Sequence, residues 1–395
     1  MSHHDGGSSA KGLGKSARNR IHKINGAQVQ RLLRKLDVIS PFLAPQLSSL
    51  QMQELTSSKD YTPGEVAVGN SGGFTDDGNG GKADAGMGRH VLQESSILGH
   101  LRRIGAFDDD DQACQQLSAT ITAIEFGAGT GRLSERLQRC TGHRMRHILI
   151  DRQEFAPNQC RDSAMRNRAG DNGSVERITG DIADFRLGEH CSTINDGGVN
   201  STKDEVPMCF CVSKHLCGPA CDLAIAVLGG KDVPSGRRPP FAFATCCHYL
   251  CTWESFSGKD YWIRLGFDED DFEVAVATSQ WYSLNGVKKR IHQNEENMSN
   301  STSNQTSQKD LIAIIDDAGE ALRGLSEDML RPSMSSEEFE RAFPREEKAK
   351  LGGAVKRLLD LLRIAKLQEL GYADAELVLY TTKSIENRLL VGRVV

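Results

Sequence analysis

The chain has 395 residues, enough for one large α/β core with appendages or for two domains. Its hydrophobic content of 38% and mean hydropathy of -0.43 are ordinary for a soluble protein, and no apolar run approaches the roughly 20 residues that a membrane span needs. Eleven cysteines, an odd number scattered through expected strands, indicate reduced thiols in a cytoplasmic or nuclear protein. We therefore expect no membrane partner, and the sequence gives no sign of an obligate protein partner.

Charge is distributed unevenly along the chain. Residues 1–35 carry eight Lys or Arg against one acid, which is +7 and leaves -12 for the remainder of a net charge of -5. A basic arm on an acidic body indicates an anionic partner. Nucleic acid is favoured over membrane because no amphipathic anchor with bulky aromatic residues accompanies the arm. A solvated tail is the alternative.

The N-terminal elements are expected to lie apart from the main core. Residues 24–55 have helical spacing in part, interrupted by Pro41 and Pro45. Eight of the twenty residues from 69 to 88 are glycine, which is typical of a flexible linker. We predict a small helical, basic extension, a glycine-rich linker and one large domain, over residues 1–68, 69–88 and 89–395.

The large domain alternates helical and apolar segments. It opens with a helix over 90–107, and further helices are expected to about residue 140, around 158–168 and over 349–370. We expect strands over 121–125, 148–151, 175–179, 207–212 and 241–245, and a closing hairpin over 376–380 and 389–395. Polar insertions are expected near 192–206, 229–240 and 292–310. This alternation predicts a doubly wound α/β sheet.

A glycine-rich turn follows the first expected strand, which ends in Glu125. Glycine can adopt φ > 0 and lets a ligand lie against the backbone, and the helix N-terminus beyond the turn favours a negative group. Gly127, Gly129 and Gly131 give G-x-G-x-G, whereas the dinucleotide fingerprint G-x-G-x-x-G would end at Arg132. S-adenosylmethionine (SAM) therefore fits this turn better than NAD.

Two acids at strand ends complete the expected cofactor site. Asp151 lies at the right distance downstream to bind a ribose diol. Asp181 follows the third strand, where a carboxylate can accept the exocyclic amino protons of adenine; a turn or helix-cap aspartate is the alternative. The predicted cofactor-binding residues are Glu125, Gly127, Gly129, Gly131, Asp151, Asp181 and Ile182.

The expected fold is thus a class I SAM-dependent methyltransferase. Such a fold is Rossmann-like, with a mostly parallel seven-stranded sheet and an antiparallel C-terminal strand. The closing hairpin suits this variant of the doubly wound fold better than the dehydrogenase variant. The small basic N-terminal extension is additional to it.

The segment after the fourth expected strand carries candidate proton acceptors. Enzymes that methylate exocyclic amines commonly have Asn/Asp-Pro-Pro-aromatic there, whereas this chain has SKHLCG, so an amine acceptor is disfavoured. An oxygen acceptor must lose a proton, which histidine can receive near neutral pH, while Lys214 needs a pKa depressed by burial or a neighbouring cation. An ion pair for the lysine and a structural role for either histidine are the alternatives. The catalytic candidates are Lys214, His215, His248 and Glu254.

Two other kinds of chemistry remain open. Cys246 follows the fifth strand, as does the nucleophile of RNA cytosine C5-methyltransferases, although the Pro-Cys pair that those enzymes usually add after strand four is missing. Cysteines and a histidine between Cys209 and Cys251 also offer enough ligands for zinc. No C-x₂-C spacing occurs among them, and cysteines on strands are often plain core residues. We therefore predict no metal site.

Several segments from about residue 90 to the C-terminus resemble the eukaryotic tRNA ribose 2′-O-methyltransferases that modify nucleotide four of the acceptor stem, the tRNA:m4X modification enzymes. The most specific are SKHLCGPACD and ATCCHYLCTWESFSG. The others lie at residues 95–101, 125–134, 151–152 and 384–391. The resemblance implies SAM as methyl donor and the 2′-hydroxyl of a tRNA acceptor stem as acceptor.

The N-terminal region departs from that family. Its members usually begin with small Cys/His zinc-binding modules, whereas the first cysteine of this chain is Cys114. We expect these modules to be absent or to lie outside this chain, and their contribution to RNA binding to come from the basic arm. An alternative of another class is a non-catalytic tRNA-binding protein with a relict SAM fold.

Overall fold

The computed structural model describes residues 20–48, 83–107, 121–141, 145–169, 174–191, 209–233, 236, 238–284, 311–382 and 384–394. The chain divides into two compact units. The helical unit comprises residues 1–49, 217–219 and 247–366, and the sheet unit comprises 50–216, 220–246 and 367–395. The predicted insertions at 192–206 and 292–310 lie outside the described residues, as does the predicted linker up to residue 82.

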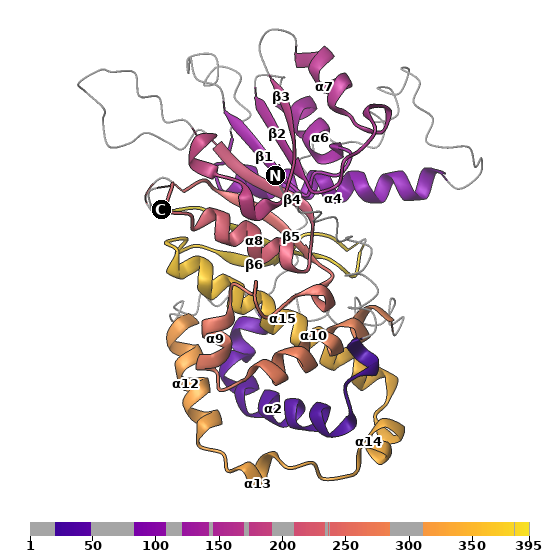
Figure 1. The fold of residues 1–395 in the computed structure, drawn as a ribbon, viewed down its shortest axis with the longest axis vertical. Helices are drawn as coiled ribbons and strands as arrows, with labels where there is room; N and C mark the ends of the chain where they lie inside the picture. Colours follow the sequence, from indigo (N-terminus) through magenta and orange to yellow (C-terminus); the bar gives the residue numbers. More distant parts are fainter. Residues whose placement is uncertain are drawn as a thin grey trace, which may run out of the picture. The chain divides into compact units, whose positions relative to one another are not determined.

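Seven strands form one sheet in the sheet unit, in the order β3-β2-β1-β4-β5-β7-β6 (Figure 1). β1 is parallel to β2 and β4, and β2 is parallel to β3, whereas β7 is antiparallel to β5 and β6. The predicted α/β sheet, mostly parallel with a closing antiparallel pair, is confirmed. The strands are β1 (Thr122–Phe126), β2 (Arg146–Asp151), β3 (Val175–Thr179), β4 (Cys209–Cys217), β5 (Phe241–Cys246), β6 (Glu376–Leu379) and β7 (Arg388–Gly392).

Helices and short 3-10 turns connect these strands. The helices are α4 (Ala83–Arg103), α6 (Arg132–Cys140), α7 (Asp162–Ala169) and α8 (Pro219–Leu228). The 3-10 turns are η2 (Pro157–Gln159), η4 (Ile182–Asp184) and η5 (Leu187–Glu189). α4 begins at Ala83, within the range expected to be linker, so the helix is longer than its apolar pattern indicated.

One side of the sheet packs against α4 and α6, and we call this side the α4 face. Its core joins Leu98 and Leu101 of α4 to Leu133 of α6, and Val212, Ala244 and Leu389 are among its strand residues. Because side chains alternate along a strand, every second residue of β4, β5 and β7 lies on this face. The central strands are buried on both sides, as a parallel sheet requires.

β4 is longer than its apolar run predicted. The strand was expected to end at Val212, whereas it continues to Cys217. Lys214 and Leu216 are buried within it. The segment that carries candidate catalytic residues is therefore the carboxyl end of a central strand, where ligands bind in sheets of this type.

The helical unit is organised around α2 (Gly26–Ser48), which contacts α10 (Glu269–Leu284), α12 (Leu311–Arg323) and α14 (Ser336–Ala342). The predicted interruption is wrong, because α2 continues through both Pro41 and Pro45. Burial of its apolar side, including Leu32 and Ile39, outweighs the backbone hydrogen bonds that the prolines cannot make. Among the described residues, no helix combines the length and the apolarity needed to cross a membrane.

The other helical elements of this unit are η1 (Arg20–His22), η7 (His248–Leu250), α9 (Lys259–Arg264), α13 (Glu327–Leu330) and α15 (Arg345–Glu369), which continues into the sheet unit. α15 buries its predicted apolar stripe, including Val355 and Leu362. It also buries Lys356 and Arg363, which the sequence placed away from the stripe. Arg363 donates a hydrogen bond to Asp360 at 3.0 Å, so the buried guanidinium is paired.

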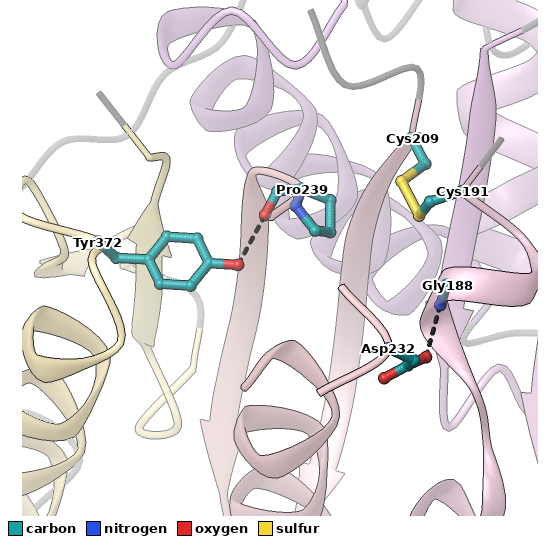
Figure 2. The surroundings of a disulfide bond; sticks show 6 residues. All are labelled: Gly188, Cys191, Cys209, Asp232, Pro239 and Tyr372. Carbon is teal, nitrogen blue, oxygen red and sulfur yellow. Dashed lines mark hydrogen bonds between the residues drawn. A yellow bond between two sulfur atoms is a disulfide. The ribbon is translucent and has the colours of Figure 1, made fainter. Parts of the chain in front are cut away.

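A disulfide bond corrects the prediction that all cysteines are reduced. Cys191 and Cys209 are bonded, with their Cα atoms 5.5 Å apart. Figure 2 shows the bond between the segment after η5 and the first residue of β4. Gly188 N–H donates to Asp232 at 2.7 Å nearby, and the Tyr372 hydroxyl donates to the Pro239 carbonyl at 3.0 Å. Which cysteines meet depends on packing that their spacing does not reveal.

Candidate active site

The turn between β1 and α6 contains three glycines in the left-handed region. Their φ angles are 63° at Gly127, 54° at Gly129 and 84° at Gly131. A Cβ at Gly127 would lie 2.9 Å from the His215 carbonyl oxygen, and one at Gly131 would lie 2.8 Å from Leu149. A Cβ at Gly129 would meet nothing within 4 Å. Packing thus requires two of the glycines, whereas Gly129 faces open space in which a ligand can approach the backbone.

Asp151, at the end of β2, holds this turn. Its Oδ2 accepts a hydrogen bond from Gly129 N–H at 2.8 Å, and its Oδ1 accepts one from Gln153 N–H at 2.8 Å. The carboxylate is half-buried, and each oxygen has a second lone pair. Asp151 can therefore fix the turn and still accept hydrogen bonds from a ligand.

Arg177 on β3 holds the other side of the same peptide. Its Nη1 donates to the Gly129 carbonyl at 2.8 Å. Its Nε and Nη2 donate to Asp162 at 2.6 and 2.8 Å, and these bonds raise the pKa of the guanidinium. The sequence analysis missed this residue, because an arginine 48 positions after the turn carries no local signal.

Glu125 lies inside the fold rather than on its surface. It is 3% exposed, and its Oε2 accepts hydrogen bonds from Ser134 N–H at 3.0 Å and from the Ser134 hydroxyl at 2.5 Å. Gly131 has no side chain to cap α6, so the glutamate performs this role for the third residue of the helix. Burial raises the pKa of Glu125 to about 7, although both hydrogen bonds oppose the rise.

Asp181 caps the 3-10 turn η4. Its Oδ1 accepts a hydrogen bond from Ala183 N–H at 3.0 Å, and its Oδ2 lies 3.5 Å from Nε of Arg152. The helix-cap alternative is therefore realised, and a contact with adenine stays a prediction. Ile182, which follows it, is buried.

Lys214 lies on the α4 face at the carboxyl end of β4, in a polar cluster with residues of α4. Its Nζ donates to Oε1 of Glu94 at 2.7 Å and lies 3.2 Å from Nδ1 of His90. Arg136 of α6 donates to the other oxygen of Glu94 at 2.8 Å. The sequence analysis missed Glu94, which lies in a helix 120 positions earlier.

Burial sets the electrostatics of this cluster. It lowers the pKa of Lys214, and the charges of Arg132 and Arg136 act in the same direction, while Glu94 opposes them. Burial raises the pKa of Glu94, but Lys214 and Arg136 outweigh it, and the net pKa is lowered. The carboxylate stays ionised, and the lysine releases its proton more readily than a surface lysine does.

The other three catalytic candidates are distributed over both units. His215 is exposed on β4, and its carbonyl is the atom closest to Gly127 in the turn. His248 belongs to the helical unit and is 2% exposed, with Nε2 2.8 Å from Asp360. Burial lowers the pKa of His248 despite the charge of Asp360. Glu254, in the same unit, is exposed.

Comparison with known proteins identifies the family. The family model described as methyltransferase TRM13 matches residues 92–393, well over half of the chain. The chain belongs to this family. The matched region contains the glycine turn and all eleven residues predicted as site residues.

Curated TRM13 relatives match a large part of the chain at low identity. A "tRNA:m(4)X modification enzyme TRM13 homolog" of Dictyostelium discoideum is 26% identical over 311 residues, 77% of this chain and 52% of the relative. The TRM13 enzyme from Schizosaccharomyces pombe is 28% identical over 52% of this chain and 50% of its own length. The human homolog is 25% identical over 77% of this chain and 64% of its own length. The chain thus spans about half to two thirds of these relatives. No solved structure matches it significantly.

Basic residues that precede the TRM13 match are engaged inside the helical unit. Lys35 is paired with Asp271 at 2.5 Å, and both are buried. Arg31 lies within 4 Å of three carboxylates, and Arg20 lies 3.6 Å from Glu273. Three of the eight basic residues in 1–35 lie before residue 20, outside the described residues. An exposed basic arm is therefore a prediction for residues 1–19 rather than for α2.

The zinc alternative concerns cysteines in and around the matched motifs. Cys209 is in the disulfide. Within the helical unit, the thiols of Cys217 and Cys247 lie within 4.8 Å of each other. Structural zinc usually takes four protein ligands, and these two are half of that number. The expectation of no metal site stays a prediction.

Proposed function

We propose that this protein transfers a methyl group from SAM to the ribose 2′-hydroxyl of nucleotide four in a tRNA acceptor stem. The observation that carries the proposal is the peptide of Gly129, open to a ligand and held by Asp151 and Arg177 at the carboxyl edge of the sheet. The strand order and the antiparallel β7 support a class I SAM-dependent methyltransferase fold. The tRNA in the names of the relatives supports the acceptor.

The residues around the turn fit the donor. Gly129 offers backbone that a ligand can approach, and Asp151 offers lone pairs for two ribose hydroxyls. Asp181 and Ile182, at the turn after β3, are our candidates to contact the adenine, and the cap from Glu125 keeps the N-terminus of α6 in place. SAM, when bound, supplies a methyl group activated by a sulfonium charge. The chain contributes alignment, which can account for on the order of 7 to 11 kcal/mol of a barrier.

Lys214 is our choice for the group that receives the acceptor proton. Its amine is placed by Glu94, and burial has already lowered its pKa, which brings a lysine closer to the range useful for general base catalysis. His215 is exposed beside the turn and can receive the proton or contact a phosphate. His248 is enclosed beside Asp360, and we assign it a structural role.

Incubation with labelled SAM and tRNA transcripts, followed by mapping of the labelled nucleotide, tests the proposal. We expect the label on the ribose of nucleotide four and on no other nucleotide. Label on a cytosine ring, abolished by Cys246→Ala, would replace the proposal with C5 methylation. Binding of tRNA without binding of SAM would indicate a relict fold.

A matched variant sharpens the test of the donor site. Asp151→Ala would also release the Gly129 N–H, so a loss of SAM binding would be ambiguous. Asp151→Asn can still accept the hydrogen bond from Gly129 N–H through its amide oxygen, while it loses the acceptor for Gln153 N–H and acceptors for the ribose. We expect calorimetry to show weaker SAM binding by Asp151→Asn, with a loss of thermal stability no larger than that of one hydrogen bond. Unchanged affinity would remove Asp151 from the donor site.

A further inference from the structure

The Asn387 side chain is a buried amide without a hydrogen-bond partner. It is 1% exposed, and neither Oδ1 nor Nδ2 is bonded to any residue that the structure describes. Its backbone carbonyl accepts a hydrogen bond from Tyr380 N–H at 2.9 Å, which fixes the residue beside the end of β6. Buried polar groups are nearly always paired, because an unpaired one loses its hydration without compensation. This amide therefore points to a ligand.

The strand register places Asn387 with the polar cluster of Lys214. Arg388 pairs with Thr245 of β5, so Asn387 comes one position further toward the carboxyl edge of the parallel strands. By alternation it shares the α4 face with Leu389, as Lys214 does with Val212. The core on this face thus gives way to polar side chains at the edge where ligands bind.

Tyr380 provides an independent sign that these groups are close together. It belongs to the core on the α4 face. Burial raises the pKa of its hydroxyl, and the next contributions come from Cys246, Glu386 and Glu94. Glu94 is the partner of Lys214, and Tyr380 is the backbone partner of Asn387. The strand register and the shared core residues thus put the amide and the lysine on the same face of the sheet, toward its carboxyl edge.

The position of Asn387 is on the acceptor side of the glycine turn. The order β1-β4-β5-β7 puts three strand spacings between the turn and β7, or roughly 14 Å at about 4.8 Å for each spacing. Lys214 on β4 lies between them. Under the proposed function, β4, β5 and β7 are the strands left for the acceptor, because the turn and the end of β2 are assigned to the donor.

We propose that Asn387 binds the ribose of the acceptor nucleotide, and this rests on the proposed function. A ribose 2′-hydroxyl both donates and accepts a hydrogen bond, and a carboxamide offers one acceptor and two donors. Asn387 orients the hydroxyl, while Lys214 receives its proton. Asn387 is thus a specificity residue that distinguishes RNA from DNA at the reacting nucleotide.

Paired substrates and an isosteric variant test this assignment. Binding of tRNA and of the same tRNA with a 2′-deoxynucleotide at position four is measured by fluorescence anisotropy for the wild type and for Asn387→Leu. We expect the wild type to bind the all-ribose tRNA about tenfold more tightly, the effect of losing two hydrogen bonds, and the variant to bind both equally. Its melting temperature should not fall, because leucine removes an unpaired buried amide.

The outcomes separate this inference from the proposed function. A variant that keeps the ribose preference, a wild type that lacks it, or a clear fall in melting temperature would each overturn the role of Asn387. Failure of the wild type to methylate any tRNA would instead overturn the proposed function. Ser213→Ala is the matched control, because its buried hydroxyl is also unpaired among the described residues but lies on the opposite side of β4. It should keep the preference.

Discussion

Glu125 makes the stability of the sheet unit depend on pH in a direction that is unusual for a carboxylate. The side chain is enclosed, and burial raises its pKa from 4.5 to about 7. Between these values the unfolded chain has released the proton while the folded protein retains it. The folded state then binds more protons, so stability falls as pH rises through this window. Above this pH window Glu125 is ionised in both the folded and the unfolded state, and the decrease in the free energy of unfolding is then at its largest.

The size of the effect follows from the two pKa values. The interval from 4.5 to about 7, at 1.36 kcal/mol for each pH unit, corresponds to about 3 kcal/mol. Glu125→Gln removes the ionisable group, and its amide oxygen can still accept the hydrogen bonds from Ser134. We expect this variant to gain about 2.5 kcal/mol relative to the wild type between pH 5 and pH 8, because part of the loss has already occurred at pH 5.

Urea unfolding at both pH values measures this difference, because other titrating groups are common to the two proteins. Far-ultraviolet circular dichroism is the appropriate signal, since all three tryptophans lie in the helical unit. Glu154→Gln, an exposed position, controls for the change in net charge. A difference between Glu125→Gln and wild type that stays within about 0.5 kcal/mol at the two pH values would refute the reasoning.

Three further predictions concern the turn, the lysine and the basic residues. Gly127→Ala should lower the free energy of unfolding in urea by more than the roughly 1–2 kcal/mol that a left-handed conformation costs a residue with a Cβ, because the new methyl also meets the His215 carbonyl. Gly129→Ala should mainly lower the affinity for SAM, measured by calorimetry. Glu94→Gln should move the acid limb of the pH profile of kcat/KM to lower pH, since Glu94 raises the pKa of Lys214. Arg136→Gln should move that limb to higher pH, since Arg136 lowers the same pKa. Shifts of the two variants in the same direction would contradict this prediction. Lys35→Met should lower the stability of the helical unit by about 1–3 kcal/mol, because buried Asp271 loses its closest cation and keeps only the more distant Arg31, at 3.7 Å. Lys11→Gln with Lys15→Gln should leave tryptophan-monitored unfolding unchanged and reduce the salt dependence of tRNA binding.

Local patterns were sufficient for the parts of the fold in which one segment determines its own conformation. The glycine spacing predicted the turn, because φ > 0 at alternate positions favours glycine whatever surrounds it. The strands with continuous apolar runs, such as Phe241–Cys246, lie close to where they were expected. The strand end of β4 was missed, because Ser213 and Lys214 are polar and only their neighbours in the sheet keep them extended.

Partners far apart in the sequence were not predictable from it. Nothing near Lys214 points to Glu94, and nothing near Gly129 points to Arg177, because each pair meets only when helices and strands pack. The prolines of α2 are a second case in which packing decides. Their local pattern predicts that the helix is interrupted, whereas burial of its apolar side keeps the helix continuous. The disulfide between Cys191 and Cys209 likewise follows from proximity in space.

The sequence by itself determined the α/β class, the glycine turn with Asp151 near it, and the candidates Lys214 and His215, because strand periodicity, glycine spacing and strand-end acids are local properties. Only the tertiary structure decided which candidates have the burial and the charged neighbours that their proposed roles require. It buries Lys214 beside Glu94, encloses His248 beside Asp360, and leaves the Asn387 amide unpaired among the described residues. Burial and charge pairing set proton affinity and hydrogen-bonding capacity, and both arise from residues that packing brings together.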